Sequence, residues 1–176
     1  MRYSLDLGCG DKVKNPFGAE RTFGVDLTSD EESVVVADLV REPIPFHDES
    51  FDFVTAFDFI EHIPRSSDIP CRRNPFIDVM NEVYRVLKAQ GVFLSFTPCY
   101  PSEAAFSDPT HVNIITKDTF PNYFTGQTPG ASRYGFYGRF SLIANQWHDW
   151  NSWPLSVHPT VPNPGKTHLL TLLRKM

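Results

Sequence analysis

Four short hydrophobic runs open the chain, and each is bounded by Gly, Asp or Pro. The runs cover residues 3–7, 22–25, 34–37 and 51–56. Continuous apolar runs of this length are typical of strands that are buried on both faces of a parallel sheet. The links between the first three runs are short, whereas a crossover with a full helix needs about a dozen residues or more. We therefore expect a stub helix or an irregular loop in each of the first two crossovers.

The clearest helical pattern follows these runs. Asn74 is a plausible N-cap, and Pro75 suits the first helical position. One apolar stripe recurs at three- and four-residue spacing and consists of Phe76, Val79, Met80, Val83, Val86 and Leu87. Gly91 is predicted to end the helix as its C-terminal cap, and residues 92–96 are predicted to form a fifth strand.

The rest of the chain is richer in proline and less regular. We expect a loop over residues 98–132 with one short helix near 117–124, a long strand over 134–147, a loop over 148–166 and a last strand over 168–173. The last two strands are predicted to pair antiparallel at one edge of an otherwise parallel sheet.

Length, charge and cysteine usage narrow the class of protein. The 176 residues fit a single domain, which we divide into a regular half (1–97) and a loop-rich half that contains the final hairpin (98–176). A net charge of −5 disfavours a nucleic acid partner. No apolar stretch is long enough to span a membrane, and three dispersed cysteines indicate neither a disulfide framework nor a metal pair. We therefore expect a cytoplasmic protein.

Acidic residues end the first three predicted strands, beside a glycine-containing turn. Asp6 lies in the first strand before Gly8 and Gly10, Asp26 ends the second strand, and Asp38 follows the third. In open α/β sheets, ligands bind beyond the carboxyl ends of the strands. A carboxylate can accept both hydroxyl protons of a ribose.

The acid in the first strand separates two classes of nucleotide ligand. Asp6 would repel a pyrophosphate but would suit a cation. NAD also calls for a third glycine, where this chain has Val13. The pattern therefore favours S-adenosylmethionine over a dinucleotide, and a dinucleotide-binding oxidoreductase remains the weaker alternative.

The segments LDLGCG, GVDLTS, ADL, FDFVTAFDFIEHIP and VYRVLKAQGVFLSFTP together resemble class I S-adenosylmethionine-dependent methyltransferases, in a compact variant with shortened first crossovers. The resemblance implies an α/β fold, a Rossmann-like three-layer sandwich whose seven-stranded, mostly parallel sheet has the order 3-2-1-4-5-7-6 with strand 7 antiparallel. It also implies that the product is S-adenosylhomocysteine. The cofactor-binding residues that it implies are Asp6, Gly8, Cys9, Gly10, Asp26, Leu27, Asp38, Leu39 and Phe57.

Candidates for the methyl-transfer chemistry lie after the fourth and fifth strands. His111 is the candidate general base, because imidazole titrates near neutrality, and Asp108 could orient it. His62 and Asp58 are weaker candidates for contact with the acceptor, since such residues often have structural roles instead. His148, Asp149, His158 and His168 match no usual ligand spacing and were interpreted as loop polar residues, so no metal site is predicted.

These observations predict an enzyme that methylates a small molecule, with a hydroxyl of a saccharide or secondary metabolite as the favoured acceptor. The alternative from another class is a catalytically silent partner subunit with the same fold. Because little sequence precedes the first strand, residues 98–166 or a second subunit of a homodimer must cover the site.

Overall fold

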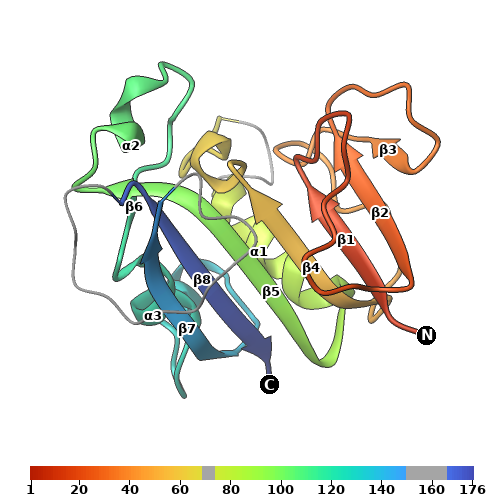
Figure 1. Cartoon of the computed structure of the whole chain (residues 1–176). Coiled ribbons are helices and arrows are strands. Elements are labelled where there is room, and N and C mark those ends of the chain that lie inside the picture. The colour runs from red at the N-terminus through yellow and green to blue at the C-terminus, as the bar shows by residue number, and fades with distance from the viewer. Residues whose placement is uncertain (69–73, 150–165) are drawn as a thin grey trace.

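The computed structural model describes residues 1–68, 74–149 and 166–176 and forms one mixed sheet flanked by helices (Figure 1). The strands are β1 (Tyr3–Leu7), β2 (Arg21–Asp26), β3 (Val34–Val36), β4 (Phe51–Phe57), β5 (Leu87–Tyr100), β6 (Ile115–Thr116), β7 (Phe140–His148) and β8 (His168–Lys175). The α-helices are α1 (Pro75–Val86), α2 (Ala104–Ser107) and α3 (Thr119–Phe124), and the 3₁₀ helices are η1 (Ile60–His62) and η2 (Gly130–Tyr134).

The sheet has the predicted topology. Its strand order is β3-β2-β1-β4-β5-β8-β7, and the short β6 pairs with β5 beside this path. The first five strands are parallel, whereas β8 runs antiparallel to both β5 and β7. If only the seven long strands are numbered, the order is 3-2-1-4-5-7-6, so the predicted fold class is confirmed.

The first crossovers contain no helix, as their length predicted. Residues 8–20 and 27–33 consist of turns and irregular backbone, and so do residues 37–50. Arg85 of α1 holds the last of these segments: its guanidinium donates to Asp48 at 2.8 Å, to Glu82 at 2.6 Å, and to two backbone carbonyls of the segment at 2.8 Å. A loop bonded to α1 therefore replaces a helix there.

The two faces of the sheet are covered differently. Helices α1 and α3 pack on one face and contribute to the main hydrophobic core. The other face carries a smaller cluster of Phe57, Leu94, Phe96 and Leu170, with Phe17 from the β1–β2 loop packed against it. In the described parts of the chain this face is covered by a loop and not by a helix, which follows from the short crossovers.

Several element boundaries differ from the predicted ones. Helix α1 begins at Pro75 as predicted but ends at Val86, because Leu87 joins β5 and pairs with Phe51. Gly91 therefore lies inside a strand and does not cap the helix. The predicted strand over 134–147 begins only at Phe140, since the preceding residues form η2 and a connecting segment.

The interpretation of His148 and His168 as loop polar residues is wrong, whereas the predicted start of the last strand at His168 is confirmed. His148 ends β7 and His168 begins β8, where the two residues pair with each other and are 95% buried. His158 lies outside the described residues. No helix of the described chain is long and apolar enough to cross a membrane.

Candidate cofactor and acceptor site

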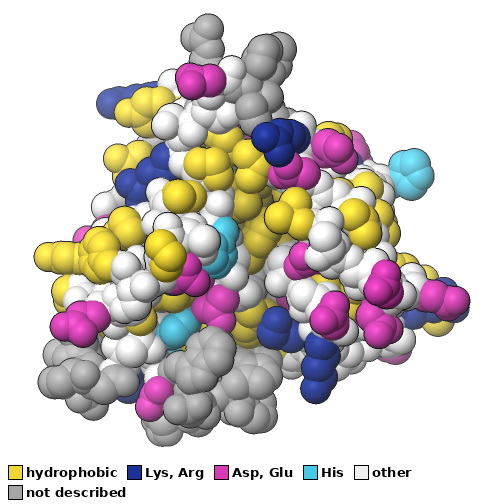
Figure 2. Space-filling model, turned by 90° about the horizontal axis from the view of Figure 1, so that it is seen from above, with side chains coloured by type: hydrophobic (Ala, Val, Ile, Leu, Met, Phe, Trp, Pro, Cys, Tyr) yellow, Lys and Arg dark blue, Asp and Glu magenta, His cyan; other side chains and the backbone are white. Residues whose placement is uncertain are grey.

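The strand order reverses between β1 and β4, and the loops that leave these strands diverge at their carboxyl ends. Such a reversal creates a crevice where open α/β sheets bind ligands. Figure 2 views this end of the molecule and shows apolar, acidic and histidine side chains gathered around the middle of the face. The candidate site is built there from β1, β2, β4 and the segments that follow β4 and β5.

Gly8 makes the turn at the end of β1. Its φ is +64°, and a Cβ atom added there would lie 2.4 Å from Cδ2 of Phe59. Its amide donates to the carbonyl of Val25 at 2.8 Å, which ties the turn to β2. Only glycine combines this left-handed conformation with so close an aromatic neighbour.

Asp6 holds the loop that follows this turn. Its side chain is almost fully buried and accepts from the amide of Lys14 at 2.8 Å and from Oγ1 of Thr55 at 2.7 Å. Burial raises the pKa of this carboxyl group above its ordinary value. In the structure Asp6 therefore fixes the backbone around the site.

Asp26 and Asp38 lie at the ends of neighbouring strands. The carboxylate of Asp26 accepts from the amide of Gly10 at 2.8 Å and from that of Leu27 at 2.7 Å. The carboxylate of Asp38 accepts from the amide of Val40 at 3.0 Å and pairs with Arg41 at 2.6 Å. Backbone amides thus orient both acids at the edge of the sheet.

A cavity of about 220 Å³ lies between these acids and the segment after β4. Five of the predicted cofactor residues line it, namely Gly8, Asp26, Leu27, Asp38 and Leu39. The apolar side chains that the sequence reasoning missed are Val25, Ala37, Val40, Phe59 and Ile63. Their positions beside the predicted acids could have indicated an apolar lining.

The other four predicted cofactor residues do not line this cavity. Asp6 and Gly10 act through the hydrogen bonds described above. The Cys9 sulfur packs over Gly24, and burial raises the pKa of its thiol to about 11. Phe57 packs with its ring 6.0 Å from that of Phe96. Contact of these four with the cofactor stays a prediction.

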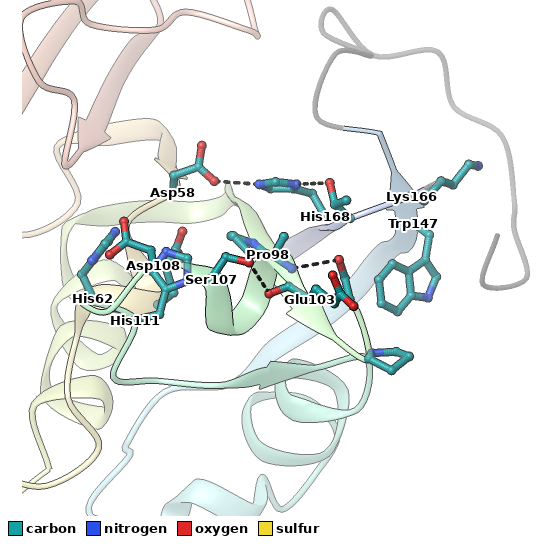
Figure 3. Close-up of a pocket in the computed structure, with 15 residues that line it drawn as sticks. Asp58, His62, Pro98, Glu103, Ser107, Asp108, His111, Trp147, Lys166 and His168 are labelled. Carbon is teal, nitrogen blue, oxygen red and sulfur yellow. Dashed lines mark hydrogen bonds and ion pairs between the residues drawn. The ribbon is translucent and has the colours of Figure 1, made fainter. Parts of the chain in front are cut away.

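A second, larger cavity of about 1,100 Å³ adjoins the first (Figure 3). All four residues predicted for the chemistry and the acceptor, Asp58, His62, Asp108 and His111, line it. The sequence reasoning missed further lining residues, among them Glu61, Glu103, Ser107, Trp147, Lys166 and His168. Asp58 and His62 line both cavities, so the two spaces meet at these side chains.

The segment that carries His111 is fastened to the segment after β4. The amides of Val112 and Asn113 both donate to the carbonyl of Glu61 at 2.9 Å, and the Asn113 side chain donates to the carbonyl of Ile60 at 3.1 Å. Arg65 donates to the Asn113 side chain at 2.6 Å. These bonds bring His111 and His62 together, with their ring centroids 5.0 Å apart.

The carboxylate of Asp108 is bonded to Thr110. It accepts from the amide of Thr110 at 2.7 Å and from its hydroxyl at 2.6 Å, and these bonds hold the pKa of Asp108 below its ordinary value. The Thr110 hydroxyl lies 3.1 Å from Nδ1 of His62, whereas Nδ1 of His111 lies 3.4 Å from the carbonyl of Ala105. These hydrogen bonds therefore connect Asp108 to His62 through Thr110, and they do not connect it to His111.

Asp58 is bonded across the cavity to the last strand. Its carboxylate lies 2.9 Å from Nε2 of His168, whose Nδ1 lies 2.7 Å from the hydroxyl of Thr167 (Figure 3). The His168 ring also stacks on Phe96 at 4.8 Å. Asp58 itself has a positive φ of 48°, so the chain turns sharply where the two cavities meet.

This arrangement defines a class of protein: a Rossmann-like α/β enzyme whose paired ligand cavities lie at the point where the strand order reverses. The sequence model of the family described as "Methyltransferase domain" matches residues 5–95, more than half of the chain. The chain therefore belongs to this family of methyltransferases.

Solved structures with the same fold include an S-adenosylmethionine-dependent methyltransferase from Archaeoglobus fulgidus, at 16% identity, a TM-score of 0.61, and coverage of 99% of this chain and 86% of the other. One from Methanosarcina mazei has 14% identity, a TM-score of 0.58 and coverage of 99% and 92%. A methyltransferase from Haloferax volcanii, in complex with the Trm112 methyltransferase activator, has 16% identity, a TM-score of 0.61 and coverage of 98% and 82%. No match was found among the curated protein sequences.

The protein is thus an S-adenosylmethionine-dependent methyltransferase, and its cofactor is S-adenosylmethionine. This result confirms the predicted enzyme class and cofactor. The matched region contains Gly8, Asp26 and Asp38 but ends before Asp108 and His111. Membership of the family therefore identifies the reaction but not the acceptor, whose candidate residues after β5 lie outside the matched region.

Proposed function

We propose that the enzyme transfers a methyl group to a hydroxyl of a small acceptor bound in the larger cavity, with a saccharide or a secondary metabolite as the acceptor class. The observation that carries the proposal is that Asp58 and His62 line both cavities. An acceptor in the larger cavity would therefore meet the cofactor beside an imidazole. The space of about 1,100 Å³ is slightly larger than the volume of about 300–1,000 Å³ that is typical of small-molecule sites.

The smaller cavity suits the cofactor in charge and chemistry. Three carboxylates, Asp26, Asp38 and Asp58, line it, and its described lining contains no lysine or arginine. Such a site favours a ligand that carries positive charge and no phosphate. We assign the ribose hydroxyls to Asp26 and the adenine to Asp38 and Leu39.

The cavity's size also fits this division. At about 220 Å³ it is smaller than a complete cofactor site, so it would hold the adenosyl end, and the remainder would extend toward the shared residues Asp58 and His62. The turn at Gly8 borders the cavity, and Phe59 closes the same side.

S-adenosylmethionine supplies a methyl group on a sulfonium, whose carbon–sulfur electron pair returns to sulfur to give S-adenosylhomocysteine as the new oxygen–carbon bond forms. The acceptor hydroxyl must also lose its proton. Of the three described imidazoles that line the larger cavity, His168 is bonded to Asp58 and Thr167, so His111 and His62 are the candidates to accept that proton. Asp108 would orient this end through Thr110.

Transfer of a labelled methyl group to a panel of saccharides and phenolic or polyol metabolites tests the proposal. His111→Ala should reduce kcat by about 10²–10⁴-fold, the usual contribution of a general base. His47→Ala, which removes an exposed imidazole outside both cavities, is the matched control and should retain the rate. Turnover of His111→Ala within about tenfold of the wild type would exclude a proton-transfer role for His111.

The charge of the larger cavity also bears on which class of molecule the enzyme methylates. The larger cavity is lined by four carboxylates, Asp58, Glu61, Glu103 and Asp108, against the single described lysine Lys166. This balance supports a neutral or cationic small acceptor over a nucleic acid. Labelled transfer to bulk RNA and to histone or ribosomal protein fractions should therefore stay at background.

A further inference from the structure

Glu61, His62 and His111 form a cluster whose potential metal-ligating atoms all lie within 4.8 Å of one another. Glu61 and His62 come from η1, and His111 comes from the loop after β5. All three line the larger cavity. The sequence spacing of the histidines had suggested no metal site, because this cluster depends on the hydrogen bonds that fasten the two segments together.

The carboxylate of Glu61 is the unusual feature. The side chain is 99% buried, and its Oε2 atom accepts from Oγ1 of Thr97 at 2.7 Å. Its other oxygen, Oε1, is buried, and no donor of the described residues lies within hydrogen-bond distance of it. A buried carboxylate oxygen without a donor is costly unless a proton or a cation satisfies it.

The two imidazoles are held in a way that leaves a second nitrogen available. Nδ1 of His62 lies 3.3 Å from the carbonyl of Thr110, and Nδ1 of His111 lies 3.4 Å from the carbonyl of Ala105. With a proton on each Nδ1, both Nε2 atoms keep a lone pair. Histidines that bind metals are usually oriented in this way, by a hydrogen bond from the other ring nitrogen.

We propose that Glu61, His62 and His111 bind a divalent transition-metal ion, with the open coordination positions facing the larger cavity. Two imidazoles and one carboxylate suit ions such as Zn²⁺, Mn²⁺ or Co²⁺ better than Mg²⁺, which prefers oxygen ligands. Bonds of about 2.0–2.2 Å would draw the ligand atoms together by about 1.5 Å, which side-chain rotation can supply.

The surroundings contain further groups that favour a cation. Asp58 and Asp108 line the same cavity, so the local potential is negative. Cys9 and Cys99 are buried and do not belong to this cluster of potential ligand atoms, and burial raises the pKa of the Cys99 thiol to about 12. Cys71 lies outside the described residues and is removed by substitution in the experiment below.

The inference deepens the proposed function and rests on it for one consequence only, the activation of the acceptor. An ion at this place would lower the pKa of an acceptor hydroxyl, as zinc does for water. His62 and His111 would then be ligands and not free bases, and the proton of the acidified hydroxyl would pass to solvent water. Binding of the ion itself requires neither cofactor nor acceptor.

Binding is measured first, in the full chain with Cys71→Ser, by calorimetry and metal analysis with Zn²⁺, Mn²⁺, Co²⁺ or Mg²⁺ alone. We expect one transition-metal ion per chain and weaker binding of Mg²⁺. Glu61→Gln keeps a carbonyl oxygen that can accept from Thr97. This variant and His111→Ala should each weaken metal binding at least about 100-fold, since even changes to groups outside the ligand set cost about 10–100-fold in metal affinity. Glu42→Gln and His47→Ala, at exposed positions, are the matched controls.

Co²⁺ also gives a readout that a structural role would not produce, because ligation by imidazoles shifts its visible absorption. Absence of stoichiometric binding, or equal binding by the wild type and both cluster variants, would overturn the metal site. Methyl transfer that survives chelation would remove only the activating role. A failed acceptor screen with intact Co²⁺ binding would instead count against the proposed function.

Discussion

Replacement of Asp26 by alanine is the sharpest test of the cofactor cavity. The Asp26 carboxylate lines the cavity and is oriented by the amides of Gly10 and Leu27. A ribose diol would add two hydrogen bonds to this charged acceptor, each worth about 1.5–3 kcal/mol. Their loss, about 3–6 kcal/mol together, should weaken binding of S-adenosylhomocysteine by about 10²–10⁴-fold.

The same substitution should have a smaller effect on folding. It removes two amide–carboxylate bonds at a half-exposed side chain, so we expect a loss of about 1–2 kcal/mol in the free energy of unfolding. For a chain of this size the melting temperature should fall by about 2–8 °C. Calorimetric titration well below that temperature therefore measures binding by folded protein.

Two variants complete the measurement. Asp26→Asn keeps one carbonyl acceptor and should bind with intermediate affinity. Asp30→Ala removes an exposed acid from the same β2–β3 link outside the cavity and should bind normally. If Asp26→Ala bound S-adenosylhomocysteine as tightly as Asp30→Ala does, the ribose assignment would be wrong.

Three further predictions concern the framework of the site. Gly8→Ala introduces a Cβ 2.4 Å from the Phe59 ring at a φ of +64°. Cofactor affinity measured by calorimetry should therefore fall more than tenfold, by at least about 1.4 kcal/mol. Unchanged affinity would show that the Phe59 side chain can move aside without cost. Arg85→Leu leaves two carbonyls without their donor and Glu82 with the Ile44 amide as its remaining donor, so urea unfolding should show a loss of about 2–4 kcal/mol with unchanged affinity of the folded enzyme. Burial raises the pKa of Asp6, so the folded state retains a proton that the unfolded state releases, and the wild type should lose stability as pH rises from the ordinary value of 3.8 through the raised pKa. Asp6→Asn should remove that part of the slope in urea titrations, and an identical slope in both proteins would refute the assignment.

The sheet could be predicted because its signals are local. The early hydrophobic runs are each short and bounded by Gly, Asp or Pro, and the short links between the first three of them predicted a stub helix or an irregular loop, of which the structure has the loop. The boundary at Leu87 could not be predicted in this way. Its side chain continues the apolar stripe of α1, and only its pairing with Phe51, distant in the chain, assigns it to the sheet.

The cofactor side of the site was predictable for a similar reason. Parallel strands end at one edge of the sheet, so acids at strand ends, such as Asp26 and Asp38, had to meet there. The acceptor side was harder to predict from the sequence, because its residues come from segments without regular spacing. His168 begins a predicted strand, but only the pairing of that strand with β5 and β7 places its side chain opposite Asp58.

The acids of the two cavities differ in how their negative charge is compensated. This difference bears on both cofactor binding and metal binding. Asp26 accepts from backbone amides, Asp38 pairs with Arg41, and Asp58 contacts His168. Glu61 is more deeply buried than these acids, yet its Oε1 has no described donor. Where the two cavities meet, ligands would add positive charge: the sulfonium of the cofactor near Asp58, and a divalent ion at Glu61. Two positive charges at neighbouring acids repel each other, so a saturating metal ion should raise the Kd for S-adenosylmethionine relative to that for S-adenosylhomocysteine, which lacks the sulfonium charge. Parallel titrations of both ligands, with and without Zn²⁺, measure the sign of this coupling, and identical shifts for the two ligands would show that the ion and the sulfonium do not share the same field.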